Sequence, residues 1–276
     1  MKRVNWNKLD EIVTISSGSF CKRRLTLFSI FKNEIYFCQA FFNHYRSIGV
    51  EQFLILDDNS DDGTREFLEA QPDCVVLTSR LGFWEKVVYR SDRGLNYRSR
   101  GEHFLKSGIP QFFLKNEYSV YVDADEFLIL PPGVSDLSQL VDQLRAQRVG
   151  AVASSLIEFY PRLTSDMPKD VPMVSSGLFE MCPYFDCRKL VEISAFGKPV
   201  PLYPSKLRDL AVMHHISVET RFRKKFLEMC LGRALANPMS YKTPIALHTS
   251  NRYYVSSHRV RGKVATGKLL SLAHFV

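Results

Sequence analysis

The segment that most constrains the fold is an apolar run followed directly by a cluster of carboxylates. Residues 118–122 have the length and the β-branched and aromatic content of a buried strand. Asp123, Asp125 and Glu126 follow the run at once. Because ligands bind outside the C-terminal ends of strands in open α/β sheets, this charge is predicted to lie at a binding edge. Gathering three carboxylates is costly without a cation, and a hard divalent ion shared with a ligand's phosphates is the expected one.

The rest of the first half alternates between predicted strands and helices. Strands are expected at residues 25–30, 53–56 and 74–77, and the intervening helices at 35–48, which Gly49 ends, and 65–70. Alternation of this kind predicts an α/β fold with a mainly parallel sheet and right-handed crossovers. A further helix at 137–144 and a strand at 149–156 are expected, and beyond residue 161 the periodicity weakens.

The predicted organisation is a polar N-terminal leader at 1–23, a core at 24–160 and an irregular C-terminal region at 161–276 of the same domain. The last eight residues are apolar and carry no stop signal, so the natural chain is expected to continue beyond them.

Composition limits the class of protein. The 276 residues are 45% hydrophobic and contain no apolar stretch of the ~18–20 residues that a bilayer crossing needs. No apolar segment of the secretory type follows the basic N-terminus, so a cytoplasmic protein is expected, with its six cysteines reduced. The net charge of +8 favours anionic partners such as nucleotide phosphates or lipid head groups, whereas the basic clusters match no nucleic-acid module.

Three polar segments follow predicted strands and are expected to converge at one sheet edge. They are residues 31–34 (FKNE), 57–64 (DDNSDDGT) and 123–126 (DADE). Taken alone, the second segment is equally well a turn with a helix N-cap, because Asp, Asn and Ser accept hydrogen bonds from free backbone N–H groups.

The order of these segments resembles the family 2 glycosyltransferases, which have the Rossmann-like GT-A fold. The similarity is to a bacterial branch with a Lys-Asn-Glu segment, an Asp-Asn-x-Ser-x-Asp-Gly-Thr turn and an Asp-Ala-Asp-Glu-Phe segment. It extends to residues 181–186 (MCPYFD), 242–244 (KTP), 257–259 (SHR) and 272–275 (LAHF). The resemblance covers residues 25–276 and is strongest through residue 130.

The resemblance implies a nucleotide-sugar donor, with UDP as the expected nucleotide. Asp58 would bind the uracil or ribose, and Asp125 would coordinate Mn²⁺ or Mg²⁺, with Asp123 on the ribose or the metal. His258 would complete the coordination or contact the diphosphate. The residues expected around the donor are Asn33, Glu34, Asp57, Asp58, Asp62, Asp123 and Arg100.

The same resemblance implies an inverting transfer to a glycan or lipid-linked acceptor, in which one carboxylate takes the acceptor's proton. Asp186 is the preferred base and Glu158 the second candidate, both in the acceptor-side region 161–276 or next to it. Two alternatives stay open. One is a sugar nucleotidyltransferase, although residues 29–34 lack the glycine that its phosphate loop would need. The other is a non-catalytic glycan-binding relative. A peripheral contact with an anionic membrane is a further expectation.

Overall fold

The computed structural model describes most of the first 161 residues and parts of the remainder. The described residues are 2–90, 96–161, 174–185, 191–193, 199–201, 241–256, 259–262, 264–265 and 270–275.

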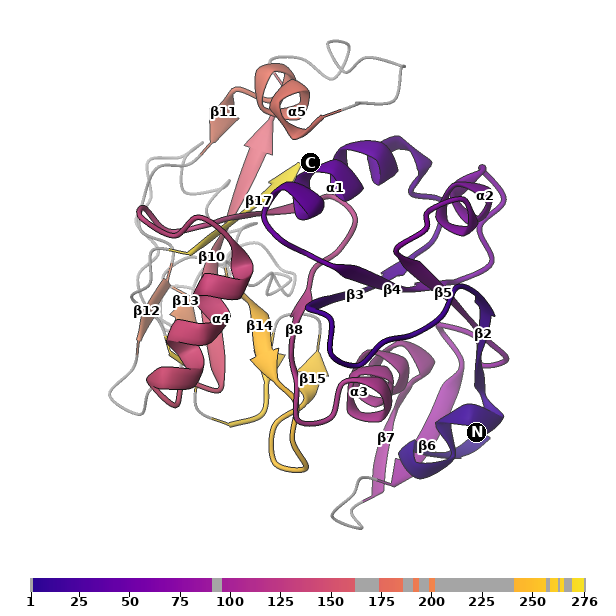
Figure 1. Cartoon of the computed structure of the whole chain (residues 1–276). Helices are drawn as coiled ribbons and strands as arrows, with labels where there is room; N and C mark the ends of the chain where they lie inside the picture. Colours follow the sequence, from indigo (N-terminus) through magenta and orange to yellow (C-terminus); the bar gives the residue numbers. More distant parts are fainter. Residues whose placement is uncertain are drawn as a thin grey trace, which may run out of the picture.

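A large mixed sheet forms the centre of the molecule (Figure 1). Four of its strands, β3, β4, β5 and β8, run parallel to one another, and β2 and β14 flank them in the antiparallel sense. The predicted α/β class is therefore confirmed, but the sheet is not mainly parallel. Among its described strands, four pairings are parallel and five are antiparallel. In spatial order the strands are β2 (Val13–Ser17), β5 (Cys74–Ser79), β4 (Gln52–Asp57), β3 (Thr26–Phe31), β8 (Tyr118–Tyr121), β14 (Tyr241–Leu247), β10 (Ala151–Tyr160), β17 (Ser271–Phe275) and β9 (Glu126–Ile129), with β11 (Tyr184–Phe185) paired to β10.

Helices cover both faces of this sheet. On one face lie α1 (Ile35–Ser47), α2 (Thr64–Glu69), α4 (Leu137–Ala146) and α5 (Ser175–Met181), which share a core with the side chains of alternate strand positions. On the other lie α3 (Gly101–Phe113) and the 3-10 helix η1 (Trp6–Glu11), with a second core. The alternation is visible in β3, where Leu27 packs on the first side and Phe28 on the second.

The segment that was expected to be a leader belongs to the packed structure. Residues 1–23 contain β1 (Lys2–Asn5), η1 and β2. Trp6 and Leu9 are buried, and Trp6 stacks on Tyr89 at a ring distance of 5.5 Å. Burial of these apolar side chains anchors the N-terminus beside α3.

The N-terminal strand belongs to a small second sheet. β1 pairs in parallel with β6 (Lys86–Arg90), which pairs with β7 (Asn96–Arg100) in an antiparallel hairpin. Two further short pairs are β12 (Val191–Ile193) with β13 (Pro199–Pro201) and β15 (Tyr254–Ser256) with β16 (Arg259–Val260).

The least expected strand is β14, which lies in the middle of the large sheet although it contains Pro244. A proline lacks the N–H that a central ladder needs. The pairing with β10 shifts register between Val152 and Ser154, opposite this part of β14, so the proline falls at an irregularity of the ladder. Among the described helices, none combines the length and the apolar character that a membrane crossing requires.

Candidate functional site

The candidate site is a cleft at the carboxyl ends of the parallel strands. The chain passes from β3 to β4 and β5 on one side, whereas β8 pairs with β3 on the other side, so the order of the strands reverses between β3 and β8. A cavity of about 420 Å³ opens there. Its lining residues are Ile30, Phe31, Lys32, Glu34, Asp58, Phe83, Trp84, Glu102, Lys106, Asp123, Ala124, Asp125 and His274.

The acidic segment forms the floor of the cleft, and a buried lysine lies beneath it. Lys242 is fully buried on β14, and its Nζ lies 2.8 Å from Asp123 Oδ2 and also contacts the Glu126 carboxylate. The Glu126 carboxylate in turn accepts the Asp123 N–H at 2.7 Å. Two of the three clustered carboxylates are therefore compensated by an ammonium group of the protein itself.

Lys242 lowers the pKa of both acids, but the net pKa shifts of the two acids are opposite. Burial opposes ionisation of Asp123, but Lys242 outweighs it and holds the Asp123 pKa well below its usual range. For Glu126, burial dominates over the attraction of Lys242 and raises the pKa. The side chain of Asp123 is 38% exposed, whereas that of Glu126 is 3% exposed, so Asp123 presents its charge to the cleft and Glu126 does not.

Asp125 pairs with a histidine from the C-terminal strand. His274 lies on β17, and its Nε2 is 3.1 Å from Asp125 Oδ2. The Phe275 N–H donates to the Asp125 carbonyl at 3.1 Å, which also joins β17 to the segment that contains Asp125. Burial lowers the pKa of His274, but the hydrogen bond and charge of Asp125 outweigh it, so the pKa is raised.

The opposite wall carries Glu34 and Asp58. Burial raises the pKa of Glu34 to about 7, and the charges of Asp125 and Asp123 contribute to that rise. Burial also raises the pKa of Asp58. Since the charges of both floor aspartates act on Glu34, the middle of the cleft has a negative potential that suits a cation.

The third wall is aromatic and contains a buried lysine. Trp84 is 66% exposed. The Lys106 side chain is 8% exposed, and its Nζ lies 3.0 Å from Glu102 and above the ring of Phe83 at 5.7 Å. Lys106 was not predicted as a site residue, because a Glu and a Lys four residues apart also describe an ordinary solvent-exposed helix pair.

Two of the predicted donor-binding acids stabilise the loops and do not line the cleft. Asp57 is buried, forms an ion pair with Arg65 and accepts the Ser60 N–H at 3.3 Å. Asp62 accepts the Thr64 N–H at 3.0 Å and the Ile35 N–H at 3.1 Å, which are backbone donors at the starts of α2 and α1. In this segment the turn-and-cap interpretation describes Asp57 and Asp62, and Asp58 is the acid that faces the cleft.

Asn33 also acts between loops. It adopts a left-handed backbone conformation with φ 58°, and its side-chain amide exchanges two hydrogen bonds with Asp61, of 2.8 and 2.9 Å. These bonds join the segment after β3 to the segment after β4, and they position Glu34 and Asp58 on the same wall.

The remaining predicted residues lie at the margin or outside the described part. Arg100 places its guanidinium 4.9 Å from the ring of Trp84 and does not line the cavity. Glu158 accepts a hydrogen bond from the Tyr160 hydroxyl and is paired in register with His274 across β10 and β17. Asp186 and His258 lie outside the described residues.

The side chains of the cleft fit a divalent ion whose coordination is completed by a bound ligand. Within the described ranges, no group of three or more His, Cys, Asp or Glu side chains is arranged to hold a metal. Asp123 and Asp125 supply two partly exposed carboxylates. Mg²⁺ commonly binds through one or two carboxylates together with substrate phosphates and water, so these two residue types fit such an ion.

Neither a scan of protein-family models nor a search of curated proteins finds a match to this chain. The function is therefore inferred from the geometry and charge of the cleft.

Proposed function

We propose that this protein is a metal-dependent glycosyltransferase of the GT-A type, which transfers a sugar from a nucleoside diphosphate sugar to a glycan or lipid-linked acceptor. The observation that carries the proposal is the meeting of Asp58, Asp123 and Asp125 in one cleft at the point where the strand order reverses. Crevices at this position bind nucleotides in open α/β sheets.

The charge of the cleft supports the requirement for a metal. Its lining contains five carboxylates against two lysines and one histidine. A diphosphate adds further negative charge, so its binding beside Asp123 and Asp125 calls for a divalent cation. Asp123 and Asp125 would hold the ion, which would supply positive charge to stabilise the leaving nucleoside diphosphate.

The other lining residues have roles that match this ligand. Asp58 accepts hydrogen bonds from the ribose or base, and Lys106 supplies a fixed positive charge for the phosphates. Trp84 offers an exposed aromatic face on which a sugar ring or base stacks. Lys242 keeps Asp123 ionised through Oδ2, and the Tyr121 hydroxyl donates to Oδ1 at 3.1 Å, so both contacts hold the carboxylate as a metal or ribose acceptor.

An inverting transfer also needs a base for the acceptor hydroxyl. Asp186 and Glu158 remain the proposed candidates. Replacement of the base by its amide, Asp186→Asn or Glu158→Gln, should abolish transfer while nucleotide binding persists, because the base contacts the acceptor and not the donor. If both variants keep transfer, the base lies elsewhere.

Calorimetric titration with UDP, with and without Mn²⁺, tests the donor site. We expect Mn²⁺ to increase UDP affinity at least tenfold in the wild type and to have no such effect in Asp125→Asn, which removes a hard anionic ligand. Asp142→Asn is the matched control, because Asp142 is a carboxylate on the exposed side of α4, 74% exposed. Metal-independent UDP binding, or the absence of binding to any nucleoside diphosphate, would contradict the proposal.

A donor screen that monitors nucleoside diphosphate release then identifies the reaction. Release of a nucleoside diphosphate on addition of an acceptor supports transfer. Formation of pyrophosphate from a nucleoside triphosphate and a sugar phosphate would instead identify a sugar nucleotidyltransferase. Metal-assisted binding without either product would identify a non-catalytic glycan-binding relative.

A further inference from the structure

The small sheet of β1, β6 and β7 has one buried and one outward face. Val4, Val87 and Tyr89 are buried and belong to the core shared with α3. Arg3, Val88 and Arg98 occupy one row of paired positions across the three strands, so their side chains share the other face.

The outward face is basic. Lys86 and Arg100 are directly paired on the same face, two residues from the row of Arg3 and Arg98. Like charges opposite each other on neighbouring strands repel and destabilise a sheet unless an anion neutralises them. Arg3, Lys86, Arg98 and Arg100 are all exposed, and within the described residues none of them forms an ion pair. The three strands contain six basic residues and no acidic one, namely Lys2, Arg3, Lys86, Arg90, Arg98 and Arg100.

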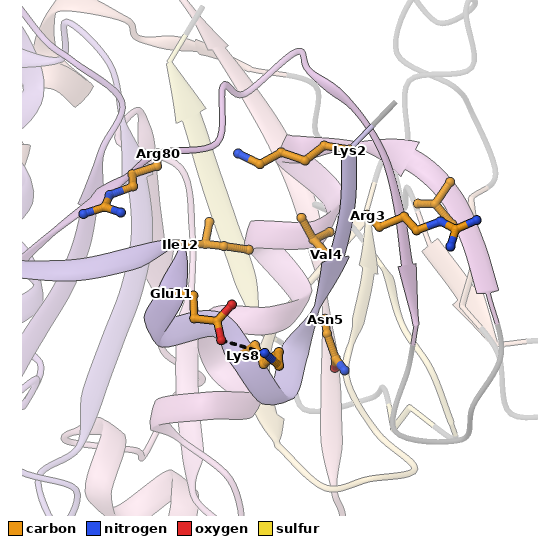
Figure 2. Close-up of a pocket in the computed structure, with 9 residues that line it drawn as sticks. Lys2, Arg3, Val4, Asn5, Lys8, Glu11, Ile12 and Arg80 are labelled. Atoms are coloured by element: carbon orange, nitrogen blue, oxygen red, sulfur yellow. Dashed lines mark hydrogen bonds and ion pairs between the residues drawn. The ribbon is translucent and has the colours of Figure 1, made fainter.

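A basic cavity continues this face around the edge of the sheet. It has a volume of about 800 Å³ and is lined by Lys2, Lys8 and Arg80 among others. Figure 2 shows that Lys2 and Arg3 leave β1 in opposite directions, with Lys2 on the side of Arg80. Glu11 is the acid of this cavity, and Lys8 pairs with it at 2.7 Å. Positive charge therefore continues from the outer face across the β1 edge.

We infer that the outward face of the β1–β6–β7 sheet docks onto a bilayer that contains anionic phospholipids. The face is a sheet, so its cations are spread over a surface, as the phosphates of a bilayer are, and they do not surround one point as in a pocket for a single phosphate. Several Lys and Arg residues near an anionic bilayer bind it cooperatively, and each contributes about fivefold to the affinity.

The neighbouring tryptophan favours a bilayer over nucleic acid. Trp84 is 66% exposed and lies against the guanidinium of Arg100, at the boundary between the basic face and the cleft. Tryptophan is enriched at membrane–water interfaces, because its amphipathic ring sits at the level of the head groups. Docking through this face would bring the mouth of the cleft close to the bilayer surface. The inference rests on the sheet and its charges and holds whether or not the proposed reaction is correct.

Sedimentation of the whole chain with lipid vesicles tests the inference. We expect binding to vesicles of phosphatidylcholine mixed with phosphatidylglycerol, none to phosphatidylcholine alone, and weakening as salt increases. The variant R3Q/K86Q/R98Q should lose affinity on the order of 100-fold, since three cations are removed. All three side chains are exposed, so circular dichroism should show an unchanged fold.

Two further variants separate this surface from the overall charge of the protein. K22Q/R23Q/R24Q removes the same number of exposed cations from the connection between β2 and β3 and should keep its affinity within about threefold. R3K/R98K preserves charge and should also bind.

Three outcomes would overturn the inference. They are no binding of the wild type to anionic vesicles, an equal loss in the two triple-glutamine variants, and a preference for double-stranded DNA over vesicles that R3Q/K86Q/R98Q abolishes. The last outcome would identify the face as a nucleic-acid surface.

Discussion

Replacing Lys242 with methionine should lower the free energy of unfolding by about 4 kcal/mol near neutral pH. Methionine keeps most of the length of the side chain but removes the ammonium group that contacts Asp123 and Glu126. A hydrogen bond between charged groups contributes about 1.5–3 kcal/mol, so two of them give about 3–6 kcal/mol. Asp123 is 38% exposed and remains partly solvated without the lysine, which places the expectation below the upper end of that range.

The loss should depend on pH in a defined direction. Without Lys242, two neighbouring carboxylates lie in the floor of the cleft, so the folded-state pKa of each should rise above its unfolded value. A carboxyl group with a raised folded pKa contributes stability that is present below the unfolded pKa and lost as pH rises through the folded pKa. The variant should therefore be less impaired near pH 5 than near pH 8, by about 1.4 kcal/mol for each unit of pKa shift.

Urea denaturation followed by circular dichroism measures both quantities. In the double variant K242M/E126Q the buried acid is neutral, so part of the lost stability should return. Lys22→Met is the matched control, because Lys22 is exposed and its replacement should change stability by no more than about 0.5 kcal/mol. A cost of less than about 1 kcal/mol for Lys242→Met, or a cost that is the same at both pH values, would refute the role assigned to this ammonium.

Four further substitutions test the cleft and the backbone. Asp125→Asn should leave the urea midpoint nearly unchanged, because Asp125 is partly exposed, while it removes the gain in UDP affinity from Mn²⁺; a cooperative loss of fold would show a structural role instead. In metal-free buffer, Glu34→Gln should stabilise the protein near pH 8 more than near pH 5, because the folded pKa of about 7 makes ionisation of Glu34 unfavourable above its unfolded value; equal effects at the two pH values would contradict that pKa. Gly133→Ala should cost about 1–2 kcal/mol, from its φ of 80° alone. Gly18→Ala should cost clearly more, because its φ is 83° and an added Cβ would lie 2.3 Å from the Cys74 carbonyl oxygen; equal thermal-melt shifts would show that the chain relaxes around the contact.

Local patterns in the sequence predicted the first half of the fold well. The strands expected at 53–56 and 74–77 are observed as β4 and β5, and the helix expected at 35–48 is α1, which ends before Gly49 with its φ of 95°. Periodicity and capping act over a few residues, so they are readable without the tertiary structure. The hairpin of β6 and β7 was not predicted, because its strands carry many charges and show little alternation.

The candidate site was likewise predictable in part from the sequence. Its acids follow strands whose parallel pairing could be inferred, and the structure brings Glu34, Asp58, Asp123 and Asp125 into one cavity. The sequence could not show that Asp57 forms an ion pair with Arg65, because buried and exposed acids of one turn look alike. Arg65 lies in the first turn of α2, so its pairing with Asp57 depends on how that helix packs after the turn.

The sequence alone determined that an acidic segment ends a buried strand of an α/β sheet and that such charge needs a positive counterpart. Only the tertiary structure decided which groups meet it. Lys242 and His274 are separated from Asp123 and Asp125 by 119 and 149 positions, and they reach them through the pairing of β14 with β8 and of β17 with β9. No local pattern encodes such partners, since the free energy that selects them comes from burying charges together after the sheet has formed.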